Sequence, residues 1–220
     1  MTSNSDLQKL LIWLSPAFPV GAFAWSAGLE TAIVARQVHD RASAERWIAG
    51  NLAHGGIRTD AILLAHAHRA AGDAPALRDL VDLCLALTPA RERHDETLAM
   101  GDAFITAAQA WPVAGQEALP RPCPYPIAVG AVTAAHGMAL QAVLTAFLTS
   151  AVQGQVSVAV RLVPIGQGDG LAIVAALEQA VSAAAAQCQH LSLDAIGAVA
   201  YAADIAQMAH ETLPTRIFRS

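Results

Sequence analysis

The stretch from Gly137 to Val160 contains no charged side chain, and it constrains the fold more than any other segment of the chain. About 20 consecutive apolar residues suffice to cross a membrane. This stretch, however, carries a polar side chain in roughly every helical turn and contains more alanine than leucine. A helix that is apolar nearly all round is typical of the centre of a helical bundle. We therefore expect a buried central helix here and no membrane span.

Helical periodicity dominates most of the remaining sequence. Apolar residues from Leu77 to Leu87 recur at the spacing of one helix face, with Cys84 among them, and predict an amphipathic helix. The segment from Val156 to Val163 instead alternates in the manner of a strand. Because the chain has no second segment of this kind and isolated strands are unstable, we interpret it as a helix rich in β-branched residues or an extended connector. The predicted fold class is all-α.

The composition predicts one domain over residues 1–220. Hydrophobic residues make up 55% of the chain and charged residues 14%, against roughly 25% charged in an average soluble domain. No linker interrupts the sequence, so we expect a single-domain helical bundle. The apolar excess also predicts a homodimer, since leftover apolar surface tends to become an interface. A formal net charge of −5 provides no basic patch for nucleic acid.

Motifs for catalysis or metal binding are absent from the sequence. It has no phosphate-binding loop, zinc-protease helix, paired CxxC or nucleophile elbow. The three cysteines are far apart and odd in number, which predicts neither disulfides nor a zinc site and fits a reducing cytoplasm. Cys188 and His190 lack a third metal ligand, and Glu92 and Glu96 resemble a solvated first helical turn. We expect no enzymatic activity, no metal and no cofactor.

The chain ends in HETLPTRIFRS, a short tail with the residue types that anchor interfaces. Pro214 prevents the preceding helix from continuing. No further chain follows in this sequence to cover Ile217 and Phe218. We therefore predict that residues 213–220 form a tail that is mobile in the free protein and becomes ordered against a partner.

Three sequence blocks together resemble the urease accessory protein UreF family. The first is LSPAFPVGAFAWSAGLE, from Leu14 to Glu30, which has a proline-bracketed loop before a helix. The second is VRLVPIGQGDG, from Val160 to Gly170, and the third is the terminal HETLPTRIFRS. Any one block would be a weak signal, but three in order over nearly the whole chain are a specific match.

The resemblance implies an all-helical homodimer that acts without enzymatic activity in the maturation of the nickel enzyme urease. In that family the protein binds UreD, also called UreH, and recruits the GTPase UreG, so that nickel reaches the urease apoprotein. It also implies a helix for Val156–Val163. An alternative is that Arg216 or Arg219 acts as an arginine finger that accelerates GTP hydrolysis by UreG.

The resemblance and the chemistry of the side chains together give the candidate partner-binding residues. Ser26 and Glu30 share a polar helix edge and are candidate interface residues, whereas Trp25 is core. An alternative for the proline-bracketed loop is that it only positions the following helix. The candidates are Pro19, Gly21, Ser26, Glu30, His210, Glu211, Thr212, Arg216, Ile217, Phe218, Arg219 and Ser220.

Overall fold

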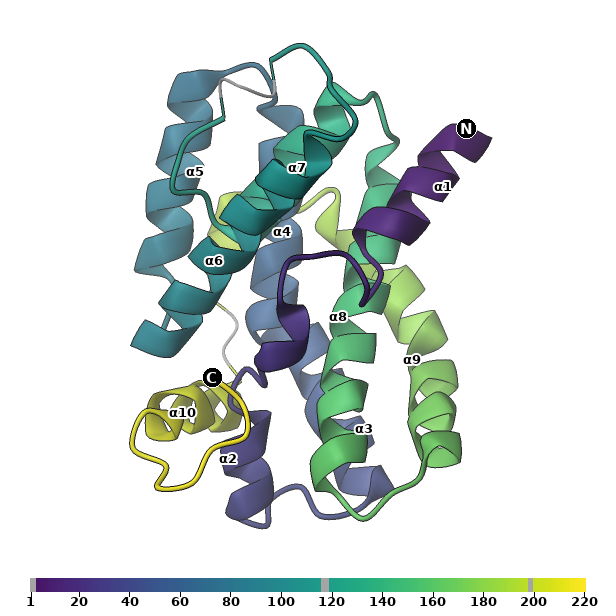
Figure 1. The fold of residues 1–220 in the computed structure, drawn as a ribbon, viewed down its shortest axis with the longest axis vertical. Helices are drawn as coiled ribbons and strands as arrows, with labels where there is room; N and C mark the ends of the chain where they lie inside the picture. Colours follow the sequence, from purple (N-terminus) through teal and green to yellow (C-terminus); the bar gives the residue numbers. More distant parts are fainter. Residues whose placement is uncertain (1–2, 116–118, 198–199) are drawn as a thin grey trace.

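Helices form all the regular secondary structure in the described part of the chain, so the predicted all-α fold class is confirmed (Figure 1). The computed structural model describes residues 3–115, 119–197 and 200–220. In chain order the elements are α1 (Asn4–Trp13), η1 (Ala22–Ala24), α2 (Leu29–Val34), α3 (Arg41–His54), α4 (Gly56–Arg69), α5 (Ala74–Ala86), α6 (Arg91–Ala108), α7 (Tyr125–Ala135), α8 (Leu140–Leu162), α9 (Gln167–Cys188), η3 (Leu193–Ala195) and α10 (Tyr201–His210).

The amphipathic helix predicted from Leu77 to Leu87 is α5, and its start follows from local chemistry. The Asp73 carboxylate accepts a hydrogen bond from the Ala76 amide at 3.0 Å, which satisfies one of the free amides of the first turn. Pro75 follows in that turn, where its missing amide costs nothing. The residues of the predicted stripe from Leu77 to Cys84 are buried. Leu87, at the C-cap just past the end of α5, is instead 39% exposed.

The long uncharged stretch forms α8, but α8 is not the most buried helix. Every residue of α7 from Pro126 to Thr133 is buried, and α7 packs against both α4 and α6 (Figure 1). Helix α8 buries one side against α4, α3 and α9 and leaves the other accessible. The fold therefore has a buried central helix, as expected, but α7 fits this description more fully than α8. The segment from Val156 to Leu162 is helical, as the resemblance implied.

Helices α8 and α9 are both long and apolar enough to cross a membrane by length and composition alone. Core helices of soluble proteins pass the same test. Half of the most apolar window of α8 is buried inside the domain, and 28% of that of α9. The two helices pack on one another and on α3 and α4, which accounts for the apolar character of their inner faces.

A row of aromatic side chains links four helices through the core. The ring of Trp13 in α1 meets that of Phe104 in α6 edge to face, with centroids 5.9 Å apart. Phe104 meets Tyr125 of α7 at 5.8 Å, and Tyr125 meets Phe147 of α8 at 5.7 Å. Such pairs add about 0.5–1.5 kcal/mol each beyond the area they bury. They fix α1 and α8 relative to the α6–α7 pair.

Helices α4 and α7 approach one another closely because Gly130 has no side chain. A Cβ atom at this position would lie 2.4 Å from the carbonyl oxygen of Leu64 and 3.0 Å from the Cβ of Ala67. The backbone of α4 has no room to yield in a buried contact of this kind. Gly130 therefore sets the spacing of the two central helices.

We predict that Gly130→Ala destabilises the fold by about 1–3 kcal/mol, the usual cost of overpacking a core. Urea-induced unfolding followed by far-UV circular dichroism measures this change. The matched control is Gly154→Ala in α8, where nothing lies within 4 Å of the added Cβ. Alanine there should stabilise the helix by about 0.5–1 kcal/mol. A neutral effect of Gly130→Ala would contradict the close contact.

Candidate functional site

The C-terminal tail packs against the domain, beside α10 and α2 (Figure 1). Phe218 is only 4% exposed, and the Arg161 guanidinium lies 4.5 Å from the centre of its ring. The Arg219 guanidinium lies 4.5 Å from the ring of Trp25. Ile217, in contrast, is 71% exposed. The prediction of a mobile tail assumes that nothing covers Ile217 and Phe218. This assumption is wrong for Phe218 and correct for Ile217.

Successive backbone amides of the tail find acceptors in the N-terminal part of the chain. The amides of Ile217 and Phe218 donate to the two oxygens of the Glu30 carboxylate at 2.8 and 3.0 Å. The Arg219 amide donates to the carbonyl oxygen of Ala24 at 2.8 Å. The Ser26 amide and hydroxyl both donate to the carbonyl oxygen of Ser220. The tail is thus held by its backbone, which fixes its path independently of most of its side chains.

A buried histidine connects the tail to two helices. The ring of His210, at the end of α10, has no exposed surface. Its Nε2 lies 3.1 Å from Glu30 Oε2, and its Nδ1 lies 2.6 Å from Glu92 Oε2. Arg216 donates to the other oxygen of Glu92. His210 therefore joins α2, α6 and the tail through two carboxylates.

A second branch of charged groups runs from the tail into the core. Ser220 donates from its hydroxyl to Glu96 Oε2 at 2.8 Å, and Arg93 pairs with Glu96 Oε1 at 2.8 Å and with Asp60 Oδ2 at 2.6 Å. Glu96 is 6% exposed. The interpretation of Glu92 and Glu96 as a solvated turn is therefore wrong, because both carboxylates face inward and are occupied by the tail and α10.

Burial and neighbouring charges shift the pKa values of Asp60 and Arg93 in this second branch. Burial raises the pKa of the Asp60 carboxyl above its ordinary value, with Arg93 opposing that shift and the Glu96 charge adding to it. Burial alone would lower the pKa of the Arg93 guanidinium. The carboxylates of Glu96 and Asp60 more than offset this, and the pKa of Arg93 lies above its ordinary value. Arg93 is thus a permanent cation at the centre of the branch.

The loop before α2 is positioned by Gly28. Its φ of +80° is a left-handed conformation that favours glycine. An added Cβ would also lie 2.6 Å from the backbone nitrogen of Gln207 in α10. Gln155 of α8 donates to the carbonyl oxygen of Ser26 at 3.0 Å. These contacts bring α2 and α10 together and present Ser26 and Glu30 to the tail.

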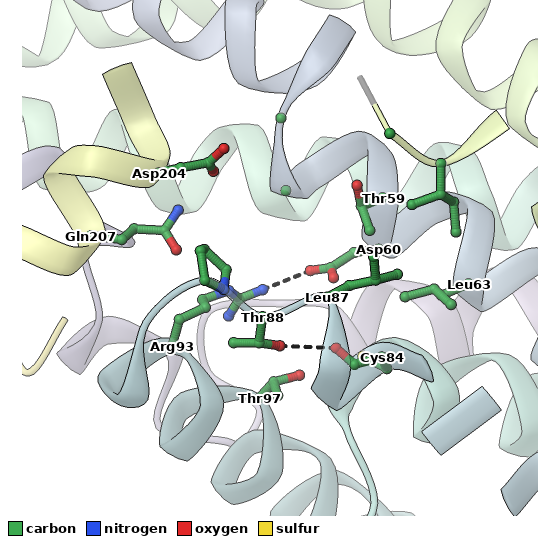
Figure 2. A pocket seen from close by; sticks show the side chains of 15 residues that line it. Thr59, Asp60, Leu63, Cys84, Leu87, Thr88, Arg93, Thr97, Asp204 and Gln207 are labelled. Atoms are coloured by element: carbon green, nitrogen blue, oxygen red, sulfur yellow. Dashed lines mark hydrogen bonds and ion pairs between the residues drawn. The ribbon is translucent and has the colours of Figure 1, made fainter. Parts of the chain in front are cut away.

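Two cavities flank the Asp60–Arg93 pair. The smaller, of about 130 Å³, is lined by α4, α5, α6 and α10, and Figure 2 shows Arg93 reaching across it to Asp60. Asp204 and Gln207 of α10 face the same space (Figure 2). The larger, of about 200 Å³, lies toward the Trp25 loop and α8. Asp60, Arg93 and Gln207 line both cavities and separate them.

The structure places the candidate residues in two different settings. The buried members contact the chain's own tail or support it. They are Ser26, Glu30, His210, Phe218 and Ser220. Gly21 and Glu211 are half-buried. The exposed ones are Pro19, Thr212, Arg216, Ile217 and Arg219. The predicted shared helix edge of Ser26 and Glu30 is wrong, because Ser26 lies in the loop before α2. Both side chains nevertheless face the tail.

Several residues of this network were missed in the sequence. Glu92, Arg93 and Glu96 in α6, with Asp60 in α4, form its inner half. A usable signal was present, because charges are rare in this chain and five of them fall within about one and a half turns at the start of α6. Arg161, which stacks on Phe218, stood in the second sequence block without an assigned role.

Within residues 3–115, 119–197 and 200–220, no cluster of three or more potential metal ligands occurs. Cys188 is buried, with 1% of its surface exposed, whereas His190 is exposed. Burial raises the pKa of the Cys188 thiol, with Arg58 opposing the shift. Cys84 and Cys123 are also buried and unbonded.

Fold and site together define a class: an all-helical domain whose N-terminal loop, α6 and C-terminal tail are joined in one buried polar network. A profile of the UreF family matches residues 38–178. The urease accessory protein UreF of Rhizobium etli is 45% identical over 223 residues, covering both chains fully. That of Agrobacterium fabrum is 47% identical over 214 residues, covering 97% of this chain and 96% of the relative. That of a Methylobacterium species is 49% identical over 218 residues, covering 96% and 87%. The chain belongs to the UreF family of urease accessory proteins.

We predict that Glu30→Gln lowers the free energy of unfolding by about 1.5–3 kcal/mol, the range for hydrogen bonds to a charged group. Glutamine keeps the shape of the side chain but removes the charge that receives two backbone amides and His210. The measurement is urea-induced unfolding at neutral pH. Glu178→Gln, on the exposed side of α9, is the matched control and should change stability by less than about 0.5 kcal/mol. Equal stability of the two variants would show that Glu30 does not hold the tail.

Proposed function

We propose that this protein is a non-enzymatic accessory protein of urease maturation that binds UreD/UreH and recruits the GTPase UreG for nickel insertion into the urease apoprotein. Membership of the UreF family supports the role in urease maturation. The partners follow from the resemblance of the three sequence blocks. One observation in this chain supports the proposal most directly. The first and third sequence blocks meet in one network centred on Glu30.

An exposed apolar surface beside the network is the proposed docking site for UreD/UreH. Tyr201, Ile205 and Met208 of α10 are 73%, 59% and 47% exposed. Their spacing of four and three residues places them on one helix face. Ile217 of the tail, 71% exposed, belongs to the same C-terminal unit. Large apolar side chains gathered in this way favour a protein partner.

The prearranged tail favours tight recognition of that partner. Its backbone is already bonded to Glu30 and Ala24, so docking would not have to order a free segment. Ordering a flexible chain costs about 1–2 kcal/mol per residue. The buried residues of the network thus support the partner surface, and the exposed ones supply the contacts.

The homodimer and the cytoplasmic location are also part of the proposal. Exposed apolar residues outside the α10 face, such as Leu7 and Leu11 of α1, supply further surface for self-association. Light scattering at micromolar concentration tests the dimer, and a monodisperse monomer would remove it from the proposal. Three buried, unbonded cysteines fit a reducing compartment.

The alternative function is stimulation of GTP hydrolysis by UreG through a tail arginine. The two candidates differ in their surroundings. Arg216 is held by an ion pair with Glu92, whereas the guanidinium of exposed Arg219 rests on the ring of Trp25. An arginine finger must reach the partner's active site. Arg219 is therefore the better candidate for this alternative.

We predict that the double variant Ile205→Ser, Ile217→Ser weakens the complex with UreD/UreH at least tenfold, because buried apolar anchors each contribute more than about 1 kcal/mol. Co-purification of this protein with UreD/UreH, followed by titration to obtain Kd, measures the loss. Leu171→Ser, which removes an equally exposed leucine from α9, should leave Kd unchanged. Unchanged binding by the double variant would rule out the α10 face as the docking site.

We predict that Arg219→Lys lowers affinity for the partner complex modestly while leaving GTP hydrolysis by bound UreG unchanged. Lysine keeps the charge but not the planar stacking on Trp25. The measurement is GTP turnover by UreG saturated with the wild-type complex or the variant complex. Loss of stimulated turnover with binding retained would favour the arginine-finger alternative, for which effects reach about 10³–10⁵ in other systems.

A further inference from the structure

His210 lies in an environment that only its doubly protonated form satisfies. The imidazole ring has no exposed surface, and each ring nitrogen faces a carboxylate oxygen, at 3.1 Å for Glu30 and 2.6 Å for Glu92. A neutral imidazole has one donor nitrogen and one acceptor nitrogen. Carboxylate oxygens only accept. The imidazolium, with two donors, satisfies both contacts at once.

The remaining charges around the ring are arranged in the same sense. On the tail, Arg216 pairs with the second oxygen of Glu92. Directly after α10, Glu211 pairs with Arg91 of α6, at 3.5 Å. Asp204, two turns earlier in α10, faces the smaller cavity (Figure 2). The two carboxylates that touch His210 therefore have His210 and Arg216 as their cations, and the tail amides complete the shell of Glu30.

We propose that His210 is a positioning residue for the tail and that it acts only as the imidazolium. It orients the Glu30 carboxylate to receive the amides of Ile217 and Phe218. Through its other nitrogen it orients Glu92 to pair with Arg216. His210 itself contacts no partner, because it is fully buried. The relevance of His210 to docking rests on the proposed function of the tail. The effect of His210 on the position of the tail does not depend on that function.

The hold on the tail depends on the charge of the His210 ring. Loss of one proton turns a ring nitrogen into an acceptor that faces a carboxylate oxygen about 3 Å away, and two lone pairs in contact repel. If Glu30 turns aside, the amides of Ile217 and Phe218 lose their acceptor. If Glu92 turns aside, Arg216 loses its partner, and in either case the tail is held less firmly. The tail is therefore held most firmly while the His210 ring carries both protons, and it loosens when one of them is lost.

The test follows the tail amides and the His210 ring in the free protein by NMR. Protection factors for the Ile217 and Phe218 amides, corrected for intrinsic exchange, are measured across the pH range in which ¹⁵N shifts report loss of the ring proton. We expect both factors to fall about tenfold or more over that range, as expected for the loss of a charge-assisted contact. Core amides such as those of Leu144 and Leu148 should keep their protection.

Two variants distinguish a positioning role of His210 from a general loss of structure. In His210→Gln the tail amides should have low protection that does not change with pH, while the core amides remain protected. The matched control is His94→Gln, which removes a more exposed histidine from α6 and should retain the wild-type profile. If His210→Gln fails to fold, the wild-type titration alone decides the question.

A wild-type tail whose protection is constant while the His210 ring loses its proton would overturn the proposal. A His210→Gln tail as protected as the wild type would also overturn it. Neither result would affect the proposed function, because complex formation with UreD/UreH is measured separately. Failure of complex formation by wild-type protein, in turn, would leave the NMR result intact.

Discussion

The packing of the C-terminal tail depends on the hydrogen bonds that the Glu30 carboxylate accepts. This residue is 3% exposed, and it accepts hydrogen bonds from two consecutive tail amides and faces His210. An ionised carboxylate can be buried only when such donors replace its hydration. Glu30 therefore needs the tail as much as the tail needs Glu30. This mutual requirement explains why α2, α10 and the tail form one unit.

The sequence predicted the fold class, but it did not predict how the candidate residues contact one another. Periodicity gave the helix from Leu77 to Leu87, and the whole-chain resemblance correctly overrode the strand-like alternation of Val156–Val163. The local pattern sufficed for the first segment, whereas the helix of the second was inferred only from the match over the whole chain. The placement of α7 as the most buried helix depended on Gly130, whose role is visible only when α4 lies against it.

The packed tail was beyond prediction for a physical reason. Its acceptors, Glu30 and Ala24, lie almost the whole chain length away, and no spacing within the last residues signals them. The same distance explains the error over Glu92 and Glu96, which carry the charge pattern of a solvated turn but face partners from α10 and the tail. Hydrophobic periodicity does not indicate which charged residues, far apart in the chain, will pair.

Residues 215–220 pack as an integral part of the fold, held by Glu30 and Glu96. The most direct test is the free energy of unfolding of a chain ending at Pro214. Removing the tail uncovers the site of Phe218 and leaves the carboxylates without their tail donors. We expect a loss of at least about 2 kcal/mol, since unsatisfied buried polar groups cost about 1–3 kcal/mol each. An unfolding midpoint equal to that of the full chain would contradict it and restore the view of the tail as a free segment.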